Sequence, residues 1–312
     1  MKQKSHILFV TEKWFAGNPQ LSFTNNFHNL FNTFDFSFGE IFSWNTIHID
    51  ESYSIYGKHV DEVIHSYCIN NSVKAVFYCL LGTDFRNPTN KTYEYLKNQN
   101  IKQCFMWPDT ASWTIDKIKQ LSGLADLHVS WDNPSLQINY SDNHLSLWVP
   151  QDQFLFHPDK QTIDINFSGS KHQQDRIKYL PFLHQNLPNI SIRGGQAEER
   201  LSPHLYAFLI RKSKINLNFP LHPFGFDQVK GRVFEILASK SLLLERSNNE
   251  TKKLFIPNKE YIEFDSPKDA LDKVKYFLEH EDQRLNICEN GYKKYIETYS
   301  SDIFWKTIMN KL

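Results

Sequence analysis

GFDQVKGRVFEILASKSLLLE, residues 225–245, predicts a short helix that runs directly into an apolar strand at 241–245. Lys230 and Arg232 stand in the first turn of this helix, and Glu235 follows on the same stripe one turn later. A helix start beside two cations suits an anionic phosphate, because unpaired N–H groups and the helix dipole favour negative charge there. A carboxylate one or two turns further on can bind the hydroxyls of an attached sugar. The stretch therefore favours a nucleotide-sugar site.

Composition narrows the class of protein. The 312 residues are enough for two domains, and Lys+Arg and Asp+Glu balance at 35 each, so no global charge favours nucleic acid or an anionic membrane. The four cysteines show no CxxC spacing, which is typical of buried thiols in a reducing compartment. The first ten residues lack the apolar run of a signal peptide, and no run of about 18 apolar residues occurs. We expect a cytoplasmic protein without a membrane span.

Alternating strand and helix patterns predict an α/β protein with parallel sheets in two halves. Ligands of such sheets bind at the carboxyl ends of the strands. We expect strands at 6–10, 36–44, 73–80, 102–107, 127–131, 145–150, 163–169, 189–194, 214–220, 241–245 and 261–264. Ser266 as a capping residue and Pro267 at the first helical position predict the start of a helix, and two further helices are expected around 281–298 and 301–311. The predicted parts are an N-terminal domain at 1–150, a linker at 151–158, a second domain at 159–298, and a C-terminal helix at 299–312 able to pack back on the first domain.

Two turns in the second half are candidates for phosphate binding. Gly169 and Ser170 end a strand before a helix that carries Arg176, and such a small turn lets backbone N–H groups approach a phosphate. Arg193 ends the next strand and points toward the same edge. The alternatives are an ordinary strand-to-helix turn with Ser170 as its cap, and an Arg193 that pairs with a loop acid. Lys230 and Arg232 can likewise form a solvated face.

Two carboxylates flank the start of the helix in the opening stretch. Asp227 and Glu235 lie eight residues apart, slightly over two helical turns, so both can face one site. In the alternative interpretation Asp227 is a helix cap and Glu235 forms a surface pair with Arg232. The spacing alone leaves both interpretations open.

The first half offers acceptor-side candidates. Asp109 follows Trp107 and Pro108 at a strand end, where partial burial would suit a general base acting on an acceptor hydroxyl. The alternative for Asp109 is the cap of the next helix. Gly17, in the loop after the first strand, permits close backbone approach to an acceptor.

Several common site motifs do not occur. The sequence has neither GxGxxG nor GxxxxGK[ST], and no GxSxG. Its 13 histidines show no HxH or HExxH spacing, so we expect neither a protein-held metal nor a cofactor.

Beyond these motifs, the chain resembles the spore-maturation CgeB-type glycosyltransferases of the group-1 class. The resemblance rests on SKINLNFP, KGRVFEILASKSLLLE and the segment from LFIPNKEYIEF to NGYKKYIETY. Upstream, ADLHVSWD, LWVPQDQFLFHP and IDINFSGSKHQQDRIKYLPFL follow the same order. The match runs from about residue 125 to 300, and the run from Lys230 to Glu245 is its most specific part.

The resemblance implies a GT-B architecture, with two Rossmann-like domains facing across a cleft. It also implies a nucleotide-diphosphate sugar in the C-terminal domain and a metal-independent transfer. Related enzymes carry two glutamates separated by seven residues, of which the second holds the ribose and the first lies near the sugar. Glu235 takes the second position, whereas Asp227 stands at the first with a shorter side chain.

We therefore expect a hexosyl- or pentosyltransferase that moves a sugar to a glycan, a small molecule or another hydroxyl acceptor. Its expected donor-binding residues are Gly169, Ser170, Arg176, Arg193, Lys230, Arg232 and Glu235, with Asp109 and Asp227 catalytic and Gly17 on the acceptor side. The alternatives are a non-catalytic partner subunit of the same fold, and an enzyme that glycosylates DNA bases. Nucleic acid is the less favoured acceptor, because the net charge is zero.

Overall fold

The chain forms two compact α/β units. The computed structural model describes residues 4–11, 32–49, 57–79, 87–107, 112–131, 143–172, 174–194, 199, 201–222 and 225–312. Among these, the first unit contains the residues up to Val149 together with Phe304–Leu312, and the second contains Pro150–Ile303. No described helix is long and apolar enough to cross a membrane.

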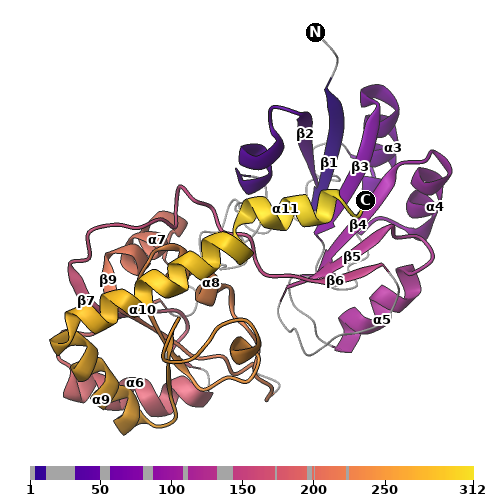
Figure 1. The fold of residues 1–312 in the computed structure, drawn as a ribbon. Helices are drawn as coiled ribbons and strands as arrows, with labels where there is room; N and C mark the ends of the chain where they lie inside the picture. The colour runs from indigo at the N-terminus through magenta and orange to yellow at the C-terminus, as the bar shows by residue number, and fades with distance from the viewer. Residues whose placement is uncertain are drawn as a thin grey trace. The chain divides into compact units, whose positions relative to one another are not determined.

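The first unit is built on a six-stranded parallel sheet in the order β2-β1-β3-β4-β5-β6 (Figure 1). Its central strands are continuous apolar runs and are buried, as expected for a parallel sheet covered on both faces. The strands are β1 (Ser5–Thr11), β2 (Phe42–His48), β3 (Val73–Cys79), β4 (Lys102–Trp107), β5 (Leu127–Ser130) and β6 (His144–Ser146), and the helices are α3 (Val60–Asn71), α4 (Asn90–Asn98) and α5 (Ser112–Leu121).

One predicted strand of this unit is wrong. The sequence at 36–44 was expected to be a strand, but residues 32–38 are helical and β2 begins only at Phe42. Phe34 and Phe38 are four residues apart, so a helix places both on one face, and their ring centroids lie 5.8 Å apart. Phe36 and Phe38 also alternate as in a strand, so the spacing of the aromatic residues did not distinguish a helix from a strand.

The second unit has a five-stranded parallel sheet in the order β11-β10-β9-β7-β8. Its core includes the side chains of Ile215, Leu217, Leu242 and Leu244, from the two central strands. The strands are β7 (Ile163–Ser168), β8 (Ser191–Arg193), β9 (Ser213–Asn218), β10 (Leu242–Arg246) and β11 (Ile262–Phe264). The helical elements are α6 (Gln174–Asn186), α7 (Pro203–Lys212), α8 (Gly231–Ala238), η2 (Thr251–Lys253), α9 (Pro267–Glu279), α10 (Glu281–Lys294) and the π-helical turn η3 (Tyr295–Tyr299). The last helix, α11 (Ser301–Met309), begins in this unit, and its residues from Phe304 onward belong to the first. The predicted fold class, α/β with two parallel sheets, is confirmed.

Several local predictions in this unit are also confirmed. Ser266 caps α9, its hydroxyl accepting from the Asp269 N–H at 3.1 Å, and Pro267 is the first helical residue. The apolar strand expected after α8 is β10, whose residues Leu242–Glu245 are fully buried. The expected linker at 151–158 contains no helix or strand and is grouped with the second unit, so its role as a linker stays a prediction.

The C-terminal residues complete the first unit. Trp305 of α11 is fully buried and packs edge-on against the rings of Phe9, Phe34 and Phe77, at 5.0–6.2 Å between centroids. Its indole N–H donates to the Thr33 hydroxyl at 2.9 Å. In Figure 1 the end of α11 lies beside β1 and β3.

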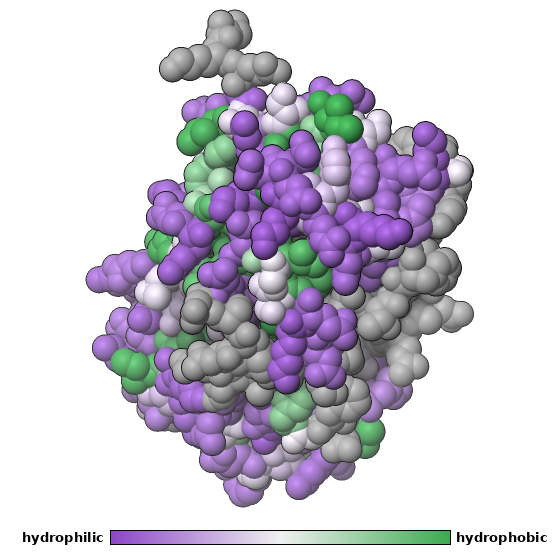
Figure 2. Space-filling model, turned by 90° about the vertical axis from the view of Figure 1, so that its right-hand side faces the viewer, coloured by the Kyte–Doolittle hydropathy of each residue, from purple (hydrophilic) through white to green (hydrophobic). Residues whose placement is uncertain are grey.

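Large apolar side chains are exposed at scattered positions among the described residues, for example at Phe36, Ile69 and Phe154. Figure 2 shows a mainly hydrophilic face on which apolar residues are scattered. All four cysteines are buried and free, as their spacing predicted.

Candidate nucleotide-binding site

The candidate site begins at α8 of the second unit. Lys230 is the N-cap of this helix, with extended backbone angles (φ −72°, ψ 147°). Val233, Phe234 and Ile236 are buried, so packing fixes the rotation of the helix. That rotation brings Arg232 to the carboxyl ends of β7 and β9.

Two guanidinium groups flank one aromatic ring in this site. The Cζ atoms of Arg176 and Arg232 each lie 5.4 Å from the centroid of the Phe167 ring. Arg176 donates from Nη1 to the Ser170 carbonyl at 2.8 Å, and Arg232 donates from Nη1 to Asn218 Oδ1 at 3.1 Å. Neither guanidinium forms an ion pair with a carboxylate in the described part of the chain.

Burial and mutual repulsion act on this pair of cations. Arg176 is buried, and its Nε has no hydrogen-bond partner among the described residues. Desolvation, followed by the neighbouring Arg232, lowers the pKa of Arg176 to about 9, so it remains a cation at neutral pH. Two close cations without a paired carboxylate are stabilised by an anion bound between them.

The turn after β7 allows Arg232 to approach closely. Gly169 has φ +154°, and a Cβ atom there would lie 2.6 Å from Arg232 Nη2. Gly194 has φ +85°, and its Cβ would lie 3.1 Å from the Gly169 nitrogen. The Gly169 N–H donates to the Arg193 carbonyl at 2.9 Å, so this amide is already used within the fold. Both positions require glycine because of space as well as backbone angle.

Glu235 lies beneath Arg232 rather than on the surface. Its Oε2 accepts from the Tyr206 hydroxyl at 2.5 Å, and the Arg232 Nε–H donates to the same hydroxyl oxygen at 3.3 Å. Burial raises the pKa of Glu235, while Tyr206 and Arg232 oppose that change. The surface-pair alternative for Glu235 is therefore wrong, because the carboxylate is buried.

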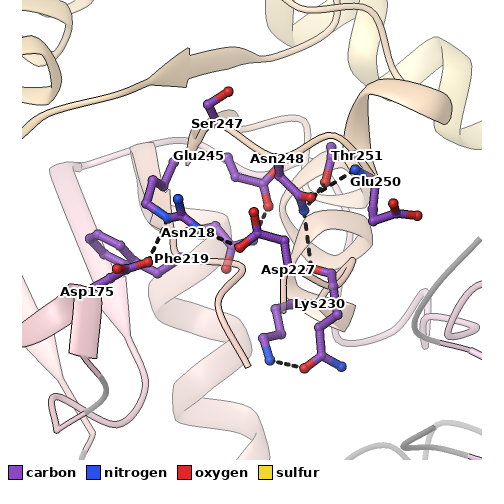
Figure 3. Close-up of polar contacts among 12 residues, drawn as sticks. Asp175, Asn218, Phe219, Asp227, Lys230, Glu245, Ser247, Asn248, Glu250 and Thr251 are labelled. Atoms are coloured by element: carbon purple, nitrogen blue, oxygen red, sulfur yellow. Dashed lines mark hydrogen bonds and ion pairs between the residues drawn. The ribbon is translucent and has the colours of Figure 1, made fainter. Parts of the chain in front are cut away.

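Asp227 lies outside α8 and pairs with an arginine from β10. Arg246 forms ion pairs with Asp227 and, at 2.6 Å between Nε and Oδ2, with Asp175 of α6 (Figure 3). Burial raises the pKa of Asp227, and Arg246 partly offsets this effect. Since Lys230 is the N-cap of α8, the helix-cap alternative for Asp227 is wrong.

A second buried carboxyl group lies next to this region. Glu245 of β10 is the register partner of Asn218 in β9, and the Asn218 Nδ2–H donates to Glu245 Oε1 at 2.7 Å. Burial raises the pKa of Glu245 to about 8, although the nearby Thr251 and Asn248 favour the ionised form. Figure 3 shows these side chains beside Asp227.

The other predicted site residues fall in three places. Lys230 donates to the Gln228 side chain, at the entrance of α8. Arg193 has an exposed side chain and contributes its carbonyl to the glycine turn. Gly17 and Asp109 lie outside the described residues. No group of three His, Cys, Asp or Glu suited to a metal ion occurs in the part of the chain that is described.

Sequence reasoning missed several residues that build the site. They are Asp175, Tyr206, Asn218 and Arg246. Tyr206 and Asn218 are polar side chains between apolar neighbours, and this is the signal that could have found them. Asp175 and Arg246 stand beside other polar residues, so the local sequence carries no such signal for them.

Comparison with known proteins identifies the family. A family model described as glycosyl transferase-like matches residues 153–310, which is about half of the chain. The chain belongs to this glycosyl transferase-like family. The matched residues include the whole of the site described above. No curated protein matches the chain significantly.

Solved structures show that the glycosyl transferase-like chain has the GT-B fold. It is similar to a glycosyltransferase from Rickettsia africae (TM-score 0.62, 13% identity, 99% of this chain and 97% of that chain covered). Sucrose-phosphate synthase from Thermosynechococcus elongatus matches with a TM-score of 0.62 at 9% identity, over 99% of both chains. HepE from Anabaena, solved in complex with UDP, matches with a TM-score of 0.61 at 9% identity, also over 99% of both chains. The predicted GT-B architecture is thus confirmed.

Proposed function

We propose that this protein transfers a sugar from a nucleoside-diphosphate donor to a hydroxyl acceptor without a metal ion. The observation that carries the proposal is the pair of guanidinium groups of Arg176 and Arg232 on Phe167, neither of which is paired with a carboxylate in the described residues. A diphosphate supplies two adjacent negative charges, which matches two adjacent cations. In this proposal the protein cations take the charge-neutralising part that a divalent ion plays in other transferases.

The chemistry follows from where charge develops. The acceptor oxygen forms a bond to the anomeric carbon, the bond from that carbon to the phosphate oxygen breaks, and the hydroxyl proton passes to a base. Negative charge grows on the departing diphosphate, and the guanidinium groups of Arg232 and Arg176 stabilise it. Asp227 and Asp109 remain our candidates for the catalytic carboxylates.

Glu235 is our candidate for binding the ribose of the donor. It lies one helical turn from Arg232, and Tyr206 bridges the two side chains. A carboxylate in this position accepts hydrogen bonds from two neighbouring hydroxyl groups. Together with the CgeB-type resemblance of residues 225–245, this supports a nucleotide sugar as the donor. A hexose or a pentose, and a glycan or another hydroxyl compound as acceptor, fit the proposal.

Calorimetry with UDP, GDP, ADP and CDP tests the proposal. UDP is the first probe, because HepE was solved with UDP and with UDP-glucose. We expect at least one nucleoside diphosphate to bind. Arg232→Ala should then reduce transfer from the matching nucleotide sugar about 10²–10³-fold, the usual effect of removing one such donor.

A matched control separates this effect from a general loss of charge. Lys214 lies at the amino end of β9, away from the site, and pairs with Asp164 at 2.7 Å. Lys214→Ala removes a cation from the same unit and should leave donor binding unchanged. Wild-type transfer by a folded Arg232→Ala variant would overturn the site assignment. Silence toward all four nucleotides would favour a non-catalytic binding subunit, and strong salt-dependent retention on DNA would favour a DNA acceptor.

A further inference from the structure

A row of polar side chains crosses three neighbouring strands of the second unit. Asn218, Glu245 and Glu263 are register partners on β9, β10 and β11, so their side chains leave the sheet on one face. Asn218 and Glu245 are fully buried. Polar residues at such positions are expected to be held by hydrogen bonds, and here those bonds lead toward Arg232.

The Asn218 amide joins Glu245 to Arg232. Its Nδ2–H donates to Glu245 Oε1 at 2.7 Å, and its Oδ1 accepts from Arg232 Nη1 at 3.1 Å. Because Glu245 offers an acceptor on one side of the amide and Arg232 offers a donor on the other, only one orientation of the Asn218 amide satisfies both. If Glu245 lost its acceptor, a flipped amide would place an N–H against the N–H groups of Arg232.

We propose that Glu245 is a positioning residue for donor binding, because through the Asn218 amide it orients the Arg232 guanidinium toward the diphosphate. This inference rests on the proposed function of the site. Glu245 itself does not contact the donor in this arrangement. Its role requires an acceptor atom and not a negative charge.

The charge state of Glu245 gives the arrangement a pH dependence. Burial keeps the carboxyl neutral at pH 7, since its pKa is raised to about 8. Ionisation of Glu245 above that pH adds a negative charge that only the Asn218 amide separates from Arg232. This charge weakens the attraction of Arg232 for an anion. The polar groups around the carboxyl are Asn218 on β9, Asn248 in the connection from β10 to η2, Thr251 on η2, and Glu263 on β11. Glu263 pairs with Lys252 at 3.3 Å and accepts from the Tyr261 hydroxyl at 3.0 Å.

Two substitutions separate the acceptor from the charge. Glu245→Gln keeps a carbonyl acceptor and cannot ionise, whereas Glu245→Met keeps the approximate volume and removes the acceptor. The probe is the tightest binder among UDP, GDP, ADP and CDP, measured by calorimetry at pH 7. We expect Glu245→Gln to bind within about twofold of wild type, and Glu245→Met to bind about tenfold more weakly, as for loss of one hydrogen bond to a charged group.

A double-mutant cycle shows whether the effect passes through Arg232. Arg232→Lys keeps the cation but loses the planar fork that Asn218 orients. In that background Glu245→Met should weaken binding by less than twofold further. An equal tenfold loss in both backgrounds would mean a merely structural role and would overturn the proposal, as would wild-type affinity in folded Glu245→Met.

The pH profile gives a second measurement that does not depend on Glu245→Met folding. Affinity of the wild type should fall several-fold relative to Glu245→Gln as the pH rises from 7 to 9. The nucleotide and the other protein groups, including Arg176, ionise in the same way in both proteins. Their effect therefore cancels when the affinity of the wild type is divided by that of Glu245→Gln at each pH. Parallel profiles would overturn the pH dependence of this arrangement, whereas the acceptor role is decided by the two substitutions at pH 7. If the wild type bound none of the four nucleotides, the proposed function itself would fail, whereas binding without coupling would remove only the role of Glu245.

Discussion

Arg232 illustrates how a single side chain becomes a site. The sequence indicates a cation at a helix start, but its ring contact with Phe167 and its hydrogen bonds to Tyr206 and Asn218 come from three other elements. None of these three partners lies within ten residues of Arg232 in the chain. Residue type was therefore predictable, and the partners were not, because they depend on the packing of α7 and α8 against the sheet.

Glu245 leads to a prediction about stability at the residue scale. Its folded pKa, about 8, lies above the ordinary value of 4.5, so the unfolded chain releases this proton first as the pH rises. The Glu245 carboxyl therefore makes its full contribution to the free energy of unfolding below pH 4.5. This contribution is lost progressively as the pH rises to about 8 and is absent above that pH. Glu245→Gln removes this loss, so its free energy of unfolding relative to wild type should increase between pH 5 and pH 9 by on the order of 4 kcal/mol.

Urea denaturation at the two pH values measures this difference. Glu297→Gln, at an exposed carboxylate on η3, is the control and should show no such increase. An offset between Glu245→Gln and wild type that is equal at pH 5 and pH 9 would contradict a neutral buried carboxyl group.

At the scale of elements, local signals worked where one residue decides the conformation. Ser266 and Pro267 predicted the start of α9 correctly, because a capping hydroxyl and a fixed φ act within one turn. The segment at 36–44 was predicted incorrectly, because its aromatic residues suit a strand or a buried helix equally well. The long helix predicted at 281–298 is interrupted by the π-helical turn η3, where Tyr299 packs on Phe234 and Phe255.

The packing of α10 against its neighbours gives a prediction at this scale. Gly291 lies in the middle of α10, and a Cβ there would stand 2.4 Å from the Glu260 carbonyl oxygen and 2.8 Å from Leu237 Cδ2. Helix propensity favours alanine by about 1 kcal/mol, but overpacking against backbone costs about 1–3 kcal/mol or more. Gly291→Ala should therefore lower the melting temperature.

Gly123→Ala is the matched control, since nothing lies within 4 Å of a Cβ at Gly123 and its φ is not positive. This variant should melt within a degree or two of wild type. A Gly291→Ala variant at least as stable as wild type would show that α10 can shift without cost.

At the scale of the whole molecule, the chain returns to its first unit at the end. Phe304–Leu312 belong with the residues up to Val149, and Trp305 fills a space among the aromatic rings of β1, β3 and the helix at 32–38. Trp305→Ala should destabilise the first unit by about 3–5 kcal/mol through the cavity it leaves.

Hydrogen exchange measured by mass spectrometry tests this prediction unit by unit. Faster exchange is expected in β1 and β3, while β9 and β10 keep their protection. The exposed neighbour Asn310 provides the control variant Asn310→Ala, which should leave both units unchanged. Equal protection of β1 and β3 in Trp305→Ala and wild type would mean that α11 does not support the first sheet.

The sequence by itself determined the fold class and most candidate donor-site residues, because strand and helix periodicity and charge at a helix start are local properties. The tertiary structure decided which of these residues meet. It placed Arg176 and Arg232 on one ring, buried Glu235 under Tyr206, paired Asp227 with Arg246, and linked Glu245 to Arg232 through Asn218. These contacts join residues up to 65 positions apart, from Phe167 to Arg232, and only the register of the strands and the packing of the helices bring such residues together.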